Sequence, residues 1–302
     1  MIVTVTLNAA LDVTYRIDQV HWNGVNRVQD LHRRAGGKGV NVARVLAALG
    51  HDVLVTGLAG GPTGRAVELD LTASALPHAL TPIGGDSRTT LAVTGPSGTA
   101  LFNEPGPRVT REELVRFLHG FAGALTGAAA VVISGSLPRG VPADFYATLA
   151  AHAADRGIPA LVDADGEALR RASAGRPAIV KPNLEELARA FPADALGPES
   201  QAELMRKAGA AAVVVSLGHD GLLAVTAEGT WRARMPYRVA GNPTGAGDAF
   251  VAGLAMGVVE GMPWPERLRL AAALGAAAVA MPVAGEIDHG TFQAVHRQIN
   301  VS

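Results

Sequence analysis

The chain has 302 residues, 26 basic and 27 acidic side chains with a formal net charge of -1, and no cysteine. Without cysteine it cannot form disulfides, thiolate metal sites or thiol nucleophiles, and the balanced charge gives no indication of a nucleic-acid or anionic membrane partner. Hydrophobic residues make up 48% of the chain, yet no stretch reaches the roughly 18 to 20 apolar residues of a membrane helix; we expect a cytoplasmic protein.

Short apolar runs alternate with longer stretches rich in alanine and leucine. The first run begins at Ile2 with no basic segment before it, so we expect no secretory signal. Capping-box spacing at residues 110–113 opens one helix, and Gly50 ends another. The alternation predicts a mostly parallel sheet covered by helices. We expect strands at residues 2–7, 53–58, 129–133, 160–163, 178–180 and 212–216, and helices at 40–49 and 114–125.

Two regions, residues 13–34 and 87–104, break this alternation. In the second, the strand-forming segments RTTLAVT (88–94) and TALF (99–102) flank the turn GPSG (95–98). We expect these excursions to form a small antiparallel sheet attached to a single domain that spans residues 1–302. Such a sheet is well placed to act as a lid over a pocket at the carboxyl ends of the parallel strands.

The segment NPTGAGDAF (242–250) precedes a helical pattern that runs to about residue 259. Glycines before a helix leave backbone N–H groups open at its positive end, where a phosphoryl group can be held. Asp248 at this helix start is a candidate base. Taken alone, the segment fits an ordinary N-cap after a tight turn better.

Two further segments carry polar groups at predicted helix starts. GGKGVNVA (36–43) adds a cation and a carboxamide; it has neither P-loop nor dinucleotide-binding spacing, and a turn with a surface Lys38 is an equal alternative. In VKPNLEEL (180–187), Asn183 and Glu186 fall on one helix face, which suits a hydrated Mg²⁺ that bridges phosphates. A plain helix start is the commoner explanation of that pattern.

Three weaker signals complete the set. VSLGHDG (215–221) is a strand that runs into a glycine turn, as expected where a nucleotide ribose or base rests on backbone, although alone it is only a turn. Asp12 and Arg88 are single polar residues in apolar or strand-forming surroundings. Each has a surface charge as its alternative explanation.

In this order, the segments resemble the ribokinase-like carbohydrate kinases of the PfkB family over nearly the whole chain. The two family signatures correspond to residues 36–43 and 242–250. Further segments are similar to the branch with 1-phosphofructokinase and tagatose-6-phosphate kinase: LNAALD (7–12), SGSLP (134–138), KPNLEEL (181–187) and SLG (216–218). The chain departs from the family at Ala9, usually proline, and at residues 242–244, where the phosphofructokinase branch more often has a Thr-Val pair.

The resemblance implies a three-layer α/β/α sandwich with a small antiparallel β lid. It also implies an ATP-dependent kinase of a ketohexose phosphate, either fructose 1-phosphate or tagatose 6-phosphate. Asp248 would remove the acceptor proton, and the amides of Gly245, Ala246 and Gly247 would form the anion hole. The substrate residues implied are Asp12, Gly37, Lys38, Asn41, Arg88 and Ser136, with Arg88 on the phosphate. The nucleotide residues implied are Lys181, Asn183, Ser216, Leu217, Gly218 and Gly221, with Asn183 and Glu186 organising Mg²⁺.

Several questions stay open at this level. Some family members bind K⁺ near the anion hole, and the sequence assigns no ligands for it here. An exposed lid commonly buries its outer face against a second copy, so we expect a homodimer, with a monomer as the alternative. Two alternative functions stay open. One is a kinase of an unphosphorylated sugar or nucleoside, which should not need the basic pair of Lys38 and Arg88. The other is a non-catalytic regulator that binds sugar or nucleotide.

Overall fold

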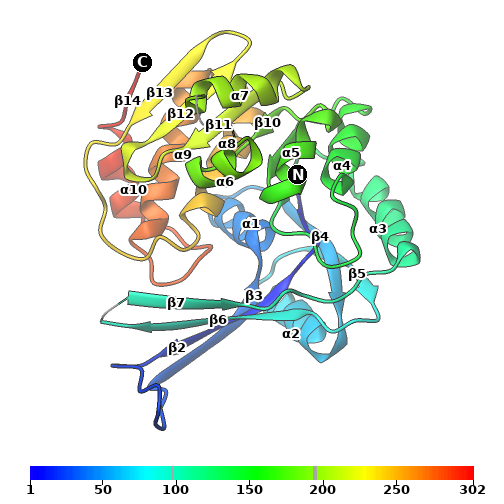
Figure 1. The fold of residues 1–302 in the computed structure, drawn as a ribbon, viewed down its shortest axis with the longest axis vertical. Helices are drawn as coiled ribbons and strands as arrows, with labels where there is room; N and C mark the ends of the chain where they lie inside the picture. The colour runs from blue at the N-terminus through cyan, green and yellow to red at the C-terminus, as the bar shows by residue number, and fades with distance from the viewer. Residues whose placement is uncertain (97, 193–195) are drawn as a thin grey trace.

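The computed structural model describes residues 1–96, 98–192 and 196–302. Their main sheet has the strand order β14-β13-β12-β11-β10-β9-β8-β1-β4-β5, and Figure 1 shows it at the centre of the molecule. Its parallel part comprises β1 (Ile2–Thr6), β4 (Val53–Gly60), β5 (His78–Ile83), β8 (Ala130–Ser134), β9 (Ala160–Asp163), β10 (Ile179–Val180) and β11 (Ala212–Ser216). An antiparallel edge follows with β12 (Leu222–Thr226), β13 (Thr230–Arg234) and β14 (Asn300–Val301).

Helices cover both faces of this sheet, which confirms the predicted three-layer α/β/α sandwich. The apolar cluster on one face includes residues of α1 (Lys38–Ala48), α2 (Gly61–Ala73), α8 (Ala246–Val259), α9 (Trp264–Val279) and α10 (His289–His296). The cluster on the other face includes residues of α3 (Arg111–Ala124), α4 (Phe145–Ala154), α5 (Gly166–Ala172), α6 (Leu184–Ala190) and α7 (Pro198–Lys207).

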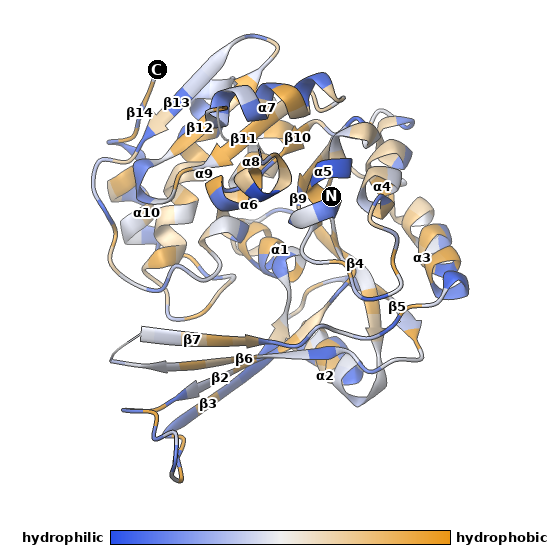
Figure 2. Ribbon diagram, viewed as in Figure 1, coloured by the Kyte–Doolittle hydropathy of each residue, from blue (hydrophilic) through white to orange (hydrophobic). Residues whose placement is uncertain are grey.

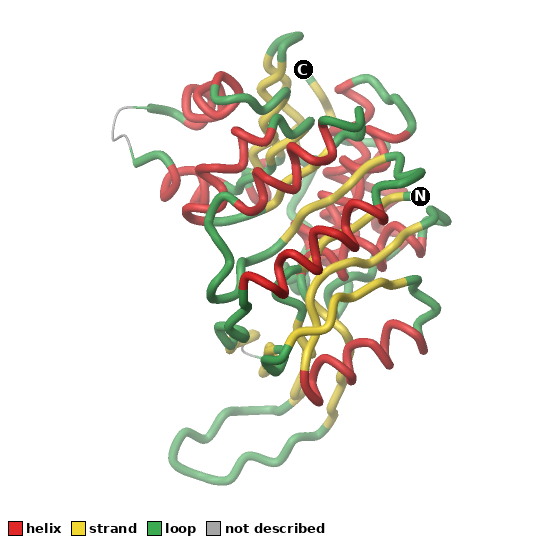
Figure 3. The backbone as a smooth tube through the Cα atoms, turned by 90° about the vertical axis from the view of Figure 1, so that its right-hand side faces the viewer, coloured by secondary structure: helices red, strands yellow, loops and turns green. Residues whose placement is uncertain are grey.

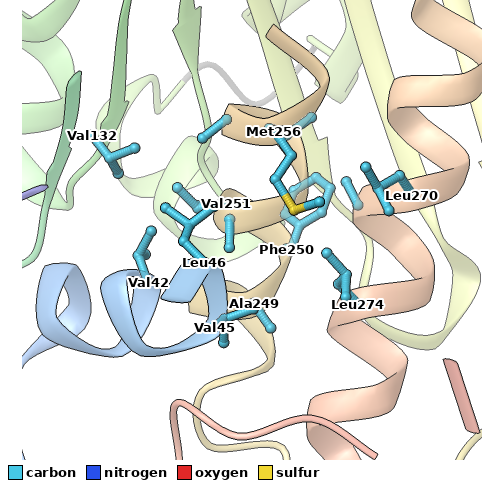
Figure 4. Close-up of a cluster of buried hydrophobic side chains, with 14 of the residues drawn as sticks. Val42, Val45, Leu46, Val132, Ala249, Phe250, Val251, Met256, Leu270 and Leu274 are labelled. Carbon is cyan, nitrogen blue, oxygen red and sulfur yellow. The ribbon is translucent and has the colours of Figure 1, made fainter. Parts of the chain in front are cut away.

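Each central strand supplies both clusters, because successive side chains of a strand point to opposite faces. Along β1, Ile2 packs into the first cluster, whereas Val3 and Val5 pack into the second. The interior strands are therefore apolar on both sides, as the orange colour in the centre of Figure 2 shows. Figure 4 shows the first cluster, where α1 side chains meet α8, and α8 meets Leu270 and Leu274 of α9.

The local signals that punctuate the helices are confirmed. The Thr110 side chain accepts a hydrogen bond from the Glu113 amide, and the Thr110 amide donates to Glu113 Oε2 at 2.7 Å. The predicted capping box at the start of α3 is therefore complete. Gly50 follows the end of α1 with a φ of 85°, in the left-handed region that favours glycine. Within the described residues, no helix is both long enough and apolar enough to cross a bilayer.

A second sheet of four strands, hereafter the lid, projects from one end of the body (Figure 3). It comprises β2 (Ala10–Arg16), β3 (Asp30–Gly36), β6 (Arg88–Gly95) and β7 (Gly98–Asn103), in the order β3-β2-β6-β7. The two outer pairs are antiparallel, but β2 and β6 run parallel, which the sequence did not predict. Their pairing is parallel because both are the outgoing strands of their excursions. The predicted turn at residues 95–98 includes Ser97, which lies outside the described residues; Gly95 and Gly98 pair across it.

Candidate active site

The carboxyl ends of β1, β8, β9, β10 and β11 meet at one edge of the main sheet, where a cavity of about 1230 Å³ opens beneath the lid. The strand order reverses between β8 and β1, and such a switch point is where open α/β sheets bind ligands. Asn8 follows β1 and donates to the hydroxyl of Ser136, which follows β8, at 3.0 Å. The cavity therefore lies where the topology predicts it.

Asp248 is the third residue of α8, and the N-cap is Gly245. The N-cap interpretation of Asp248 is therefore wrong. Gly245 has a φ of 86°, and a Cβ at this position would come within 2.6 Å of Ala284 Cβ. The amide of Ala246 donates to Pro243 O at 3.2 Å, whereas no backbone acceptor in the described residues pairs with the amides of Gly245 and Gly247. These unpaired N–H groups lie at the positive end of the helix.

The Asp248 carboxylate is buried, with 6% of the residue exposed, and lines the cavity. The side-chain amide of Asn41 donates to its Oδ2 at 2.8 Å, which fixes the orientation of the carboxylate. Burial raises the pKa of Asp248 to about 7, although the nearby Lys38 ammonium opposes the shift. A carboxylate with a pKa near neutrality is suited to take up a proton in the reaction.

Lys38 and Lys181 share one buried carboxylate, that of Asp163. The Lys38 Nζ lies 3.1 Å from Asp163 Oδ2, and the Lys181 Nζ lies 3.0 Å from Oδ1. Burial alone would raise the pKa of Asp163, but the two ammonium groups lower it to about 2. A Cβ on Gly247 would be 3.7 Å from the Lys181 Nζ, so this ammonium lies beside the start of α8.

Asp163, which pairs with two lysines that line the cavity, was not identified by the sequence analysis. It is the last residue of β9 and is 1% exposed. Ser134, the last residue of β8, donates to its Oδ2 at 3.0 Å. The available signal was a charged residue at the carboxyl end of an apolar parallel strand, the edge where sites form.

On the lid side of the cavity, Asp12 of β2 and Arg88 of β6 are half-buried, not surface charges. Arg88 donates from Nε to Asn8 O at 3.1 Å and from Nη1 to Glu104 O at 3.4 Å. Burial raises the pKa of Asp12 to about 6, although the Arg88 and Arg34 guanidinium groups lower it. A Cβ on Gly36 would come within 2.0 Å of the Asp12 carboxylate, so only glycine fits beside this side chain.

Asn183 and Glu186 form a reciprocal capping box at the start of α6, so the helix-start explanation holds for their mutual contacts. Asn183 Oδ1 accepts from the Glu186 amide at 2.8 Å, and Glu186 Oε2 accepts from the Asn183 amide at 2.8 Å. The other carboxylate oxygen, Oε1, lies 3.7 Å from the Lys38 Nζ. Lys38 thus contacts Asp163 and Glu186. Its partners differ from those of Arg88, which donates to Asn8 O and Glu104 O.

No cluster of three or more His, Asp or Glu side chains in the described part of the chain could hold a metal ion by itself. The Oε1 atom of Glu186 remains free of the capping box, and both Asn183 and Glu186 line the cavity. This donor set fits Mg²⁺, which commonly takes one or two carboxylates and completes its shell with waters and substrate phosphates.

Ser216, Gly218 and Gly221, the candidate nucleotide residues, line the cavity, as does Gly37. Leu217 is not among the lining residues and packs against the second apolar cluster. The sequence analysis missed a strip of small residues on α9 that also lines the cavity, formed by Ala271, Ala272, Gly275 and Ala276. Their spacing of three to four residues was the signal, since it places them on one helix face.

A buried carboxylate beside free amides at a helix start, with two lysines and a lid arginine around one cavity, defines a phosphotransferase that acts on a hydroxyl. The model of the pfkB family carbohydrate kinases matches residues 5–287, and the chain belongs to this family. It is an ATP-dependent carbohydrate kinase. The resemblance seen in the sequence is therefore confirmed.

Several solved structures are similar to this chain over nearly its whole length. Phosphofructokinase-2 from Escherichia coli in its tetrameric inhibited form shares 31% identity, with 98% of each chain covered and a TM-score of 0.89. Its complexes with potassium (TM-score 0.89) and with fructose-6-phosphate (TM-score 0.87) are each 30% identical over 98% of both chains. A possible 1-phosphofructokinase from Thermotoga maritima is 27% identical, covering 100% of this chain and 98% of that chain, with a TM-score of 0.88.

Proposed function

We propose that the chain transfers the terminal phosphoryl group of ATP to a hydroxyl of a ketohexose monophosphate, with Asp248 as the base. The observation that supports this most is the position of the Asp248 carboxylate, which is buried, held by Asn41 and next to free amides in a cavity that Asp12 and Arg88 also line. Fructose 1-phosphate and tagatose 6-phosphate are the first candidates, as the sequence indicates. Fructose 6-phosphate joins them because it is bound in one of the similar structures.

The reaction can be derived from these positions. The acceptor hydroxyl gives its proton to Asp248 Oδ as its oxygen attacks the phosphorus, and the bond from that phosphorus to the leaving oxygen of ADP breaks. The amides of Gly245 and Gly247, which have no backbone partner, donate to the oxygens of the transferred group. Lys181 lies beside Gly247 and adds positive charge on that side. Positioning and electrostatics supply most of the rate enhancement in phosphoryl transfer.

The acceptor binds at the lid end. Asp12 accepts hydrogen bonds from sugar hydroxyls, and Arg88 binds the phosphate that the substrate already carries, because a guanidinium group matches phosphate oxygens. Arg88 is oriented by Asn8 O and Glu104 O, which leaves its remaining N–H groups for the ligand. Asn41, Ser136 and Gly37 complete the sugar site, and Lys38 lies between the sugar and the nucleotide.

The nucleotide binds at the other end, along Ser216, Gly218 and Gly221, with the α9 strip against the base. Glu186 through Oε1, with Asn183 next to it, would hold the water shell of a Mg²⁺ ion, which would supply charge neutralisation at the ATP phosphates. Potassium is a second cation to test, because it is present in one of the similar structures.

The lid has an apolar outer face, and we propose that a second copy of the chain covers it. Cross-strand register places Tyr15, Leu31 and Val93 on one face, opposite the face with Asp12 and Arg34. Phe102 lies on the same outer face and is 50% exposed. A face of this kind is a liability in a monomer and a natural homodimer interface. We also propose that the enzyme acts in the cytoplasm, where ATP is its phosphoryl donor.

A screen of acceptors tests the proposal. Purified chain is mixed with ATP and Mg²⁺, and ADP release is measured with fructose 1-phosphate, fructose 6-phosphate, tagatose 6-phosphate and unphosphorylated fructose. We expect one of the three phosphates to give the highest kcat/KM. A higher kcat/KM for fructose would support the kinase of an unphosphorylated sugar instead. Binding without ADP release for every acceptor would support the non-catalytic regulator.

A further inference from the structure

A short segment between α9 and α10, residues 284–286, lies against two catalytic positions of the body. Ala284 packs on Gly245, the N-cap of α8, whose missing Cβ would be 2.6 Å from Ala284 Cβ. Gly285 is buried against Asn41, whose Oδ1 would be 3.2 Å from a Cβ on that glycine. In Figure 1 this loop runs along the end of the body that faces the lid. Any shift of the segment therefore reaches both the anion hole and the amide that orients the base.

The next residue of the segment, Glu286, contacts the lid. Arg34 of β3 donates from Nη1 to Glu286 Oε1 at 2.9 Å, and the two side chains are 18% and 44% exposed. Arg34 pairs in register with Asp12, so its side chain is on the cavity face of the lid. Within the described residues, no other salt bridge joins a lid strand to the body.

The charges around Arg34 make this pair sensitive to loss of its acid. Arg44 of α1 lies close enough for the two guanidinium groups to repel each other, and Asp70 neutralises Arg44. Without the carboxylate of Glu286, Arg34 would keep a like-charged neighbour and lose its partner.

We propose that the Arg34–Glu286 pair positions the catalytic groups by tying the lid to residues 284–286, and so keeps Gly245 and Asn41 in place for phosphoryl transfer. Arg34 and Glu286 are positioning residues in this scheme. Neither needs to touch the reacting atoms. The inference rests on the proposed kinase reaction for its effect on rate, and on geometry alone for its effect on the segment.

The kinetic test compares Arg34→Gln, Glu286→Gln and the double variant, with the best acceptor of the screen. We expect kcat to fall about tenfold in each single variant while KM changes less than about twofold, because small misplacements of catalytic groups reduce rate more than binding. The double variant should be no slower than either single one, since both break the same pair. Glu286→Gln leaves Arg34 in place, so a loss confined to Arg34→Gln would overturn the proposal in favour of a direct effect on Asp12.

The matched control is Arg232→Gln, which breaks the Arg232–Glu199 pair, also 2.9 Å long but remote from the cavity. A second readout, amide hydrogen exchange without substrates, does not depend on turnover. We expect faster exchange in peptides covering residues 30–36 and 281–288 in both single variants but not in the control. Unchanged exchange would overturn the proposal even if kcat fell, whereas an inactive wild-type chain would overturn only the proposed function.

Discussion

The cavity has a floor, formed by the ends of the parallel strands and the start of α8, and the lid lies above it. The two regions hold their charged groups under very different conditions. On the floor, the side chains of Asp163 and Lys181 are 1% and 6% exposed and pair with each other. On the lid, Asp12 and Arg88 are half-buried, and every described residue of β7 is exposed. Interactions between charges are stronger where water is excluded. The difference supports our proposal that the chemistry takes place on the enclosed floor and that the lid recognises the acceptor.

The same contrast applies to mobility. The floor is formed by strand ends and a helix start that pack against two apolar clusters. In the lid, most residues of β3, β6 and β7 are exposed or only partly buried, and residues 17–29 between β2 and β3 contain no helix or strand. Regions with few buried contacts open at low free-energy cost. The lid can therefore open at low free-energy cost to admit the sugar, and the Arg34–Glu286 pair is its salt bridge to the segment beside Gly245 and Asn41.

The largest effect we expect comes from the floor, with Asp248→Asn. Asparagine can still accept the hydrogen bond from Asn41 but cannot take up a proton. Loss of the base should lower kcat by about 10² to 10⁴, while binding of ATP and acceptor is retained. Steady-state kinetics and a melting curve check this, and stability should not fall, because a buried carboxylate is replaced by a neutral group. A near-normal kcat would contradict the assignment of the base.

Asp163→Asn should affect stability most. It leaves the buried Lys181 and the partly exposed Lys38 without their shared carboxylate, and breaking a buried pair this way costs about 3–5 kcal/mol. Denaturant unfolding measures the loss. The control is Asp155→Asn, because Asp155 and its partner Arg176 are more than half exposed and exposed ion pairs contribute little to stability. Because the pKa of Asp163 is lowered to about 2, its contribution should be present above its usual value of 3.8 and lost as pH falls toward 2.

Much of the floor could be predicted from the sequence, because its chemistry follows from backbone geometry. The parallel strand pattern placed the strands within a residue or two of their observed positions. The glycines before Asp248 allowed two interpretations, and the resemblance of the whole set of segments favoured the anion hole. Asp163 was missed because it ends an apolar run and its partners, Lys38 and Lys181, are far away in sequence. Long-range pairing of charges leaves no local pattern.

The lid was harder to predict. Its strands could be located from alternation and turn residues, but the parallel pairing of β2 with β6 depends on contacts between residues 78 positions apart in sequence, such as Ala10 and Arg88. The Arg34–Glu286 pair joins residues 252 positions apart and has no sequence signal at all. Asn183 and Glu186 show the reverse difficulty, since one spacing serves both a capping box and a candidate metal site.

Arg88→Ala should remove selectivity from the lid while the floor still works. A hydrogen-bonded charge contributes about 1.5–3 kcal/mol, so we expect the ratio of kcat/KM for fructose 1-phosphate to that for fructose to fall about 10- to 100-fold. Arg33→Ala is the matched control, because Arg33 pairs with Val13 and is on the opposite face of the lid. An unchanged ratio would mean that Arg88 does not contact the substrate phosphate.

The pH profile of kcat/KM should separate floor from lid. Burial raises the pKa of Asp248 to about 7, so the base is protonated below that pH and kcat/KM should fall about tenfold per unit. Asp12, whose pKa is raised to about 6, and the substrate phosphate titrate lower. The residual activity of Asp248→Asn should keep only the lower transition. Stability contributed by Asp248 should decrease as pH rises from about 4 to 7, because the folded state holds this proton more tightly than the unfolded chain. A wild-type profile that is flat between pH 6 and 8 would count against Asp248 as the titrating base.

The smallest expected effect on turnover distinguishes the two faces of the lid. Leu101 and Phe102 are neighbours on β7 with 46% and 50% exposure, but Leu101 lines the cavity and Phe102 is on the outer face. Burying a phenylalanine contributes about 1.5–3 kcal/mol, so Phe102→Ser should weaken self-association at least about tenfold, as measured by light scattering over a dilution series. Leu101→Ser should leave the mass unchanged and raise KM for the sugar phosphate a few-fold. Equal masses for both variants at all concentrations would show that the outer face of the lid is not the interface.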